Sequence, residues 1–144
     1  MKAKDFLSRL DEPRIVAAIV NAERRTSGEI RVWISSREIE DPVARAQQRF
    51  EQIGMSSTRE RNGVLLYLAP HSQKFAIIGD SGIHEKCGAA FWEELVAQTA
   101  AELRADRFTD AIVNAIHKAG ELLARHFPAR PDDRNELPNE IVRD

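Results

Sequence analysis

The residues that could do chemistry gather in three short polar segments, each beside an apolar run. These segments are Arg25–Glu29, Arg59–Asn62 and Gly79–Gly82. Carboxylate and carbonyl oxygens suit a hard cation such as calcium or magnesium. A guanidinium and backbone N–H groups suit an anion, and the two could cooperate around a metal-bound phosphate. The candidate cation ligands are Glu29, Asp80, Ser81 and Glu85, and the candidate anion-binding residues are Arg61, Asn62 and Gly82.

Each segment also has a structural explanation. Thr26–Gly28 is typical of a helix-to-strand turn, and Gly79–Gly82 of a turn that caps a helix with Asp or Ser. The glycine segment is too short for a Walker motif and lacks the alternating acids of an EF-hand. No histidine pair has ligand spacing with a third partner, so we expect no zinc site. A nucleophile built from His84 and Cys87 is disfavoured because near neighbours on one helix point in different directions.

The elements that position these segments follow from hydrophobic spacing. Residues 11–26 and 41–54 have helical periodicity, each with an Asp and a Pro at its start. Residues 29–35 alternate, which predicts a half-buried strand, while 63–69 is apolar on both faces and predicts a central strand. Residues 74–79 follow after four residues, which predicts an antiparallel hairpin. Three helical stretches follow, around 83–87, over 89–105 and over 108–127.

This order predicts a single-domain α/β sandwich in which helices flank a small mixed sheet, with a parallel crossover from the first strand to the second. In that topology the three polar segments meet at one edge of the sheet. We expect residues 1–127 to form the domain. Residues 128–144, with three prolines and many charges, should form an extended arm.

Composition and net charge argue against several classes of protein function. The 144 residues carry a net charge of -2, which argues against nucleic-acid binding through phosphate neutralisation. The charged start has no apolar leader, and no window is apolar enough to insert into a membrane, so a cytoplasmic location is expected. The single cysteine, Cys87, excludes an internal disulfide, and the sequence does not decide whether it has a redox role.

Four stretches together resemble the TPM-domain family, once described as a domain of unknown function. They are AERRTSGEIRVWIS, TRERNGVLLYLAPHSQKFAIIGDSGIHEKCG, FWEELV before the last helix, and HFPARPDDRNELPNEIV. The resemblance implies a Rossmann-like α/β sandwich. The positions that match the family are Thr26, Gly28 and Glu29, then Arg61, Asn62 and Gly63, then Gly79, Asp80 and Gly82. Members have acid-phosphatase-like, photosystem-repair, calcium-binding and receptor-accessory roles.

The chain is similar to the short soluble bacterial branch, whose implied partners are a LemA-type protein or a membrane-bound TPM protein. It lacks the acidic segment that helps to form the cleft of secreted members, since LSRLDEPRIV stands there instead. The main hypothesis, from the polar residues at the sheet edge, is a binding or accessory module with a weak divalent-cation site there. One alternative is a metal-assisted phosphomonoesterase in which Asp80 and Glu29 hold the cation and Arg61 steadies the phosphate. Another is a structural adaptor whose tail docks onto a membrane-bound partner.

Overall fold

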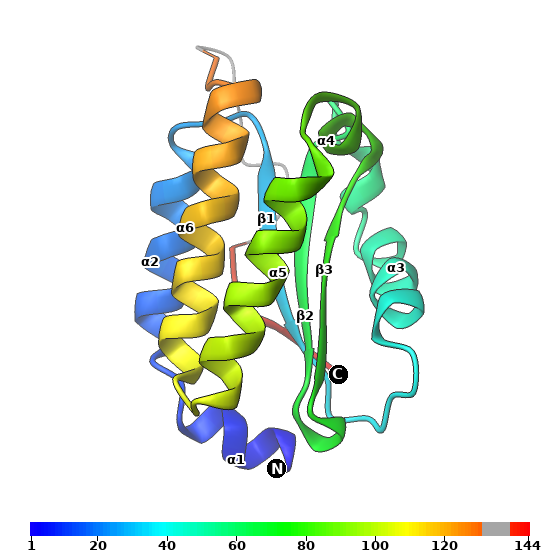
Figure 1. Ribbon diagram of the computed structural model, residues 1–144, viewed down its shortest axis with the longest axis vertical. Helices are drawn as coiled ribbons and strands as arrows, with labels where there is room; N and C mark the ends of the chain where they lie inside the picture. The colour runs from blue at the N-terminus through cyan, green and yellow to red at the C-terminus, as the bar shows by residue number, and fades with distance from the viewer. Residues whose placement is uncertain (131–138) are drawn as a thin grey trace.

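A β-sheet lies between two helical layers in the computed structural model, which describes residues 1–130 and 139–144 (Figure 1). Helices α2, α5 and α6 cover one face, α3 covers the other, and the short helices α1 and α4 lie at opposite ends. The helices are α1 (Ala3–Ser8), α2 (Glu12–Glu23), α3 (Pro42–Gln52), α4 (Ser81–Lys86), α5 (Ala89–Arg104) and α6 (Phe108–His126). The strands are β1 (Glu29–Ile34), β2 (Gly63–Ala69), β3 (Lys74–Gly79) and β4 (Val142–Arg143). The predicted α/β sandwich is thus confirmed.

Local sequence signals set the ends of the helices. Asp11 caps α2 by accepting the backbone N–H of Arg14, and Asp41 caps α3 by accepting that of Ala44 at 3.1 Å. Both helices also carry a proline in the first turn. The chain leaves α3 through Gly54, whose φ of 81° is in the left-handed region that glycine tolerates best.

The strand order β3-β2-β1-β4 brings the ends of distant segments together. Strands β1 and β2 are parallel, with Glu29 opposite Gly63, and α3 forms the crossover between them. Strands β2 and β3 form the predicted antiparallel hairpin, with Val64 opposite Gly79. Strand β4 adds to the outer edge of β1 in parallel, which the sequence pattern of the arm did not predict. The part of the arm at 131–138 lies outside the described residues.

Strand β1 is buried along its whole length, so the prediction of a half-buried strand was wrong. Its apolar residues pack into the core beneath α2, α5 and α6, and Trp33 packs into a second cluster under α3. Glu29 and Arg31 share the face of Trp33 and are only 2% and 1% exposed. Burial is tolerated there because these opposite charges lie beside each other and beside Glu23.

Across the described ranges, 1–130 and 139–144, no helix has both the length and the apolar character needed to cross a membrane.

Candidate functional site

The three polar segments do meet at one end of the sheet. Glu29 begins β1 directly opposite Gly63, and the backbone N–H of Asp80 donates to the Gly63 carbonyl at 3.0 Å. The start of β2 therefore lies at the centre of this end of the sheet, with the turn before β1 on one side and the turn after β3 on the other. We call this end, formed by the three polar segments, the polar edge. Helix α4 lies over the same end of the sheet (Figure 1).

Asp80 anchors the turn between β3 and α4. One carboxylate oxygen accepts the Ser81 N–H at 2.7 Å, and the other accepts Nε of Arg61 at 3.2 Å. The Asp80 side chain is 8% exposed, whereas that of Arg61 is 55% exposed. The carboxylate is thus fixed in the protein and capped on its outer side by a solvent-facing guanidinium.

The N–H groups at the start of α4 are already used within the protein. The Gly82 N–H donates to the Arg61 carbonyl at 2.9 Å, and the Ile83 N–H donates to the Asp80 carbonyl at 3.0 Å. An anion at this turn would have to displace these bonds. Ser81 and Glu85 are exposed on α4. Gly82 has a clear steric role, because a Cβ there would lie 2.3 Å from the Glu60 carbonyl oxygen.

A second carboxylate, that of Glu60, lies in an adjoining network that the sequence analysis did not single out. It accepts Oγ of Ser27 at 2.9 Å and pairs with Arg130. Buried Asn62 donates from Nδ2 to the Ser27 hydroxyl at 3.1 Å. Glu60 is 18% exposed and Arg130 is 51% exposed, which repeats the arrangement of Asp80 and Arg61. Only the position of Glu60 within Arg59–Asn62 could have indicated it from the sequence.

Glu29 belongs to a third network, inside the protein. Nη2 of Arg31 lies 3.6 Å from its carboxylate, and Nη1 of Arg31 donates to Glu23 at 3.4 Å and to Asn139 at 3.2 Å. Burial raises the pKa of Glu23 to about 8, and a hydrogen bond and charge repulsion from Glu29 add to the effect. Oε2 of Glu23 also accepts the backbone N–H of Ile30 at 2.8 Å.

Glu29 and Asp80 therefore share an edge of the sheet but not a common network. Glu29 begins β1 and Asp80 follows the end of β3, and β2 lies between these strands, so the two backbones are about 10 Å apart. On β2, Gly63 faces the methyl group of Met55 and the ring of Phe50. The structure does not place the two carboxylates around one ion, as the phosphatase alternative requires.

The donor chemistry of the edge nevertheless fits a hard cation. Asp80 and Glu60 supply part-buried carboxylates, and each is paired with a guanidinium that is about half exposed. Within the described part of the chain, no three His, Cys, Asp or Glu side chains form a group that could hold a metal ion. Any cation would depend on few protein charges, together with hydroxyl, amide and water oxygens.

The remaining motif positions have packing roles. The Thr26 hydroxyl donates to the Phe127 carbonyl and accepts the Gly28 N–H at 3.0 Å, which ties the turn to the end of α6. A Cβ at Gly79 would lie 2.9 Å from the ring of Trp92, and one at Gly28 would meet Leu123. These glycines keep the edge compact rather than contact a ligand.

Cys87 follows α4 and is partly buried. Burial raises the pKa of its thiol, although Arg125 and Lys86 act in the opposite direction. A raised pKa leaves less of the reactive thiolate at neutral pH, which argues against a redox role.

Comparison with known families settles the resemblance. Residues 1–122 match the TPM domain. The chain belongs to the TPM domain family. The BA42 protein of the psychrophilic bacterium Bizionia argentinensis is similar to it, with 38% identity, 92% coverage of each chain and a TM-score of 0.85. The N-terminal domain of the cg2496 protein of Corynebacterium glutamicum shares the fold at 17% identity and a TM-score of 0.59, over 90% of this chain and 76% of its own. No curated protein matches the chain.

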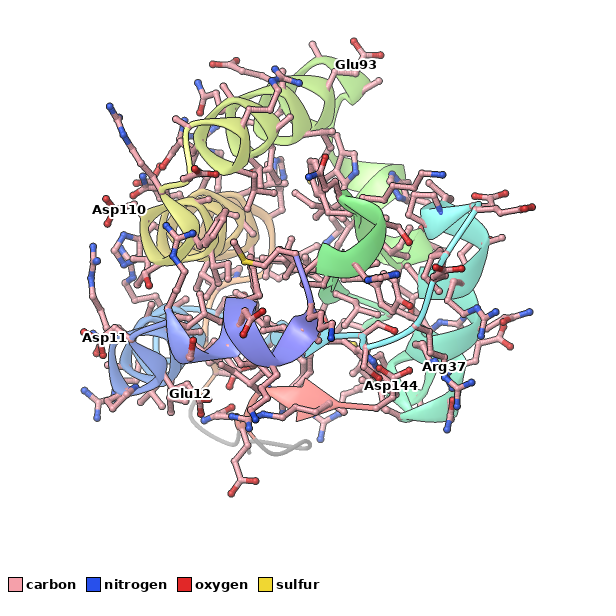
Figure 2. All side chains as sticks on the ribbon, turned by 90° about the horizontal axis from the view of Figure 1, so that it is seen from below. Asp11, Glu12, Arg37, Glu93, Asp110 and Asp144 are labelled. Atoms are coloured by element: carbon pink, nitrogen blue, oxygen red, sulfur yellow. The ribbon has the colours of Figure 1, made fainter. Side chains whose placement is uncertain are left out.

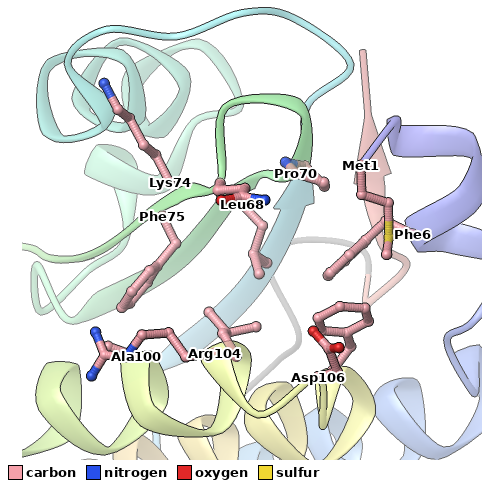
Figure 3. A pocket seen from close by; sticks show the side chains of 12 residues that line it. Met1, Phe6, Leu68, Pro70, Lys74, Phe75, Ala100, Arg104 and Asp106 are labelled. Atoms are coloured by element: carbon pink, nitrogen blue, oxygen red, sulfur yellow. The ribbon is translucent and has the colours of Figure 1, made fainter.

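This TPM domain also has a cavity of about 440 Å³ at the opposite end of the sheet. It lies between α1, the β2–β3 turn and the α5–α6 turn, with Phe6 and Phe75 on two of its sides (Figure 3). Arg104 and Asp106 bring charge to its rim. The sequence analysis missed this cavity because its walls come from segments that are far apart in the chain.

Proposed function

We propose that this TPM domain is a binding module that takes up a divalent cation weakly at the polar edge of its sheet. What supports the proposal is the repeated arrangement of a part-buried carboxylate beneath a half-exposed arginine, Asp80 with Arg61 and Glu60 with Arg130. A carboxylate held in the protein keeps its position when its counter-ion changes. The solvent-facing arginine, in contrast, can swing away at little cost, because exposed ion pairs contribute only about 0–1 kcal/mol.

In this proposal each arginine neutralises its carboxylate when no metal ion is bound. Arginine and metal compete for the same carboxylate oxygens, so affinity for the metal is low in the wild type. The bound cation would supply positive charge to hold an anionic ligand or an acidic partner segment at the edge.

Because the arginine and the metal compete, replacing the arginine should increase the affinity for the metal. Arg61→Gln should strengthen calcium binding by about three- to tenfold, because the variant removes the competing charge and leaves Asp80 in place. Asp80→Asn should abolish binding at this carboxylate. Isothermal titration calorimetry with CaCl₂ measures both changes, and a calcium-dependent rise in melting temperature gives a second readout, because a ligand that binds the native state stabilises it.

A surface ion pair elsewhere provides the matched control. Arg14 and Asp110 join α2 to α6 at 2.8 Å, with both side chains 49% exposed. Arg14→Gln also removes an arginine from an exposed carboxylate, but between α2 and α6 rather than among the three polar segments, and should not change calcium affinity. If Arg14→Gln and Arg61→Gln increased calcium affinity equally, the effect would come from the change in net charge alone. That result would contradict a site at Asp80.

The phosphomonoesterase alternative has less support because Glu29 is paired inside the protein with Arg31. Turnover of p-nitrophenyl phosphate that requires a metal and disappears in Asp80→Asn would favour it. Binding to a LemA-type or membrane-bound TPM protein stays a prediction from the family resemblance.

A further inference from the structure

The cavity at the α1 end of the sheet combines a buried apolar floor with a charged rim. Its volume of about 440 Å³ lies within the range of small-molecule sites, about 300–1,000 Å³. Phe6 and Leu68 form its floor and are 3% and 2% exposed. Phe75 and Phe108 also line it, and we call it the phenylalanine cavity after its three phenylalanines. Figure 2 views the molecule from this end, with α1 nearest to the reader.

The walls above this floor are apolar side chains that the protein itself covers only in part. Phe75, Leu103 and Phe108 pack against the main core cluster and remain partly exposed. Ala100, on α5, contributes only a methyl group to the lining. An apolar wall that faces a cavity lacks contact atoms on one side, so a ligand that fills the space gains dispersion contacts and buries apolar area. The cavity therefore suits a ligand with an apolar body.

Arg104 sets the charge that the rim favours. Its side chain is exposed at the end of α5, and within residues 1–130 and 139–144 it has no hydrogen-bond or ion-pair partner. The other cation of the lining, Lys74, donates from Nζ to the Glu40 carbonyl at 2.8 Å, which leaves its charge without a counter-ion there. Asp106 is the only acid among the described lining residues. The rim thus carries more positive than negative charge.

Arg104 and Asp106 lie on different sides of the cavity, so the acid does not directly oppose an anion at the arginine. Figure 3 shows Arg104 below Phe75, whereas Asp106 lies on the side of Phe6. A guanidinium offers two parallel N–H donors to a carboxylate, and at Arg104 a ligand can use them without breaking a described bond. A molecule with an apolar body and one carboxylate therefore matches both the walls and the rim.

We propose that the phenylalanine cavity binds a small organic acid whose apolar body lies between the three phenylalanines and whose carboxylate pairs with Arg104. The polar edge lies at the other end of the sheet (Figure 1), so the two sites share no residue. Loss of cation binding at Asp80 and loss of acid binding at Arg104 are therefore separate results.

Isothermal titration calorimetry with phenylbutyrate tests the proposal, because this acid has an aromatic ring, a short chain and one carboxylate. For a ligand of this size we expect a Kd on the order of 0.1–1 mM. Its neutral amide, phenylbutanamide, keeps the apolar body and should bind about tenfold more weakly.

Two arginine variants separate a specific contact from net charge. Arg104→Gln should weaken binding of the acid about tenfold and leave binding of the amide unchanged. Arg107→Gln removes the same charge from an exposed residue that does not line the cavity, and should bind both compounds as the wild type does. Asp106→Asn should strengthen binding of the acid by up to about threefold. Asn tolerates the φ of 60° at this position, so this variant should fold normally.

A filled cavity tests the apolar part of the site. Ala100→Leu should abolish binding of both compounds, while Ala97→Leu, an exposed change one turn earlier on α5 and outside the lining, should not alter it. Circular dichroism verifies that each variant is folded. The proposal is overturned if neither compound binds the wild type at concentrations up to about 5 mM, or if Arg104→Gln binds the acid as tightly as the wild type does. Unchanged binding in folded Ala100→Leu would equally overturn it.

Discussion

At the scale of single residues, the polar edge depends on the close contact between the backbone of Gly82 and that of Glu60 and Arg61. The carbonyl oxygens of Glu60 and Arg61 would lie 2.3 and 2.6 Å from a Cβ at this position. Arg61 itself adopts a left-handed conformation with φ of 53°, which turns its carbonyl toward Gly82. A single hydrogen atom in place of a side chain thus lets the turn before β2 contact the turn after β3.

Gly82→Ala should therefore destabilise the domain by about 1–3 kcal/mol, because a backbone carbonyl cannot move aside as a flexible side chain can. The matched control is Gly88→Ala, two residues after α4, where an added Cβ would meet nothing within 4 Å. Urea unfolding of both variants measures the difference. Equal stability of the two variants would show that the segments are not in contact.

At the scale of elements, helices α2 and α6 pack through a small-residue contact. A Cβ at Gly120 would lie 2.8 Å from the Cβ of Ala22, so the helices approach each other more closely than larger side chains would allow. Both residues are buried, and the apolar face of α6 continues this contact along its length.

Gly120→Leu should force the two helices apart and cost about 2–4 kcal/mol of unfolding free energy, since an overpacked core must shift backbone as well as side chains. Glu121→Leu adds the same side chain at the next position of α6, which is exposed, and should change stability by less than about 0.5 kcal/mol. Thermal unfolding followed by circular dichroism compares them. Similar stabilities of the two variants would show that Gly120 is not packed tightly against Ala22, because helix propensity alone would favour leucine over glycine.

Elements with their own periodicity were predictable, while those that depend on distant partners were not. The stretches over α2, α3 and α6 carry an apolar stripe, and β2 is a continuous apolar run. Strand β4 has two residues, too few for a pattern, and forms because β1 offers an edge and Trp33, Ser35 and Arg49 donate to the Asp144 carboxylate next to it. The polar face of β1 looked exposed because Arg31 and Glu29 alternate with apolar residues, but neutralising partners let it be covered.

At the scale of the whole molecule, topology determined the location of the candidate site and side-chain pairing determined its chemistry. Parallel β1 and β2, with β3 returning beside β2, bring three distant segments to one edge, as the order of elements predicted. The sequence does not indicate that Asp80 pairs with Arg61 while Glu29 pairs with Arg31. Each pairing depends on which side chains remain exposed after the helices have packed on the sheet.

The Glu23–Glu29 pair should make the stability of the whole domain depend on pH. The pKa of Glu23 rises from 4.5 to about 8 on folding, so the folded state binds an extra proton between these values. Its contribution to stability is complete below about pH 4.5 and is lost as pH rises through about 8, at up to about 1.4 kcal/mol per pH unit.

Glu23→Gln imitates the protonated acid: its amide oxygen can accept the Ile30 N–H and its NH₂ group can donate to Glu29. The free energy of unfolding of this variant should stay flatter between pH 5 and 8 and exceed the wild-type value at pH 8. Glu51→Gln, an exposed change of the same charge on α3, should keep the wild-type slope. Urea titrations across this pH range decide the matter, and parallel curves for all three proteins would mean that the buried acid is not protonated in the folded state.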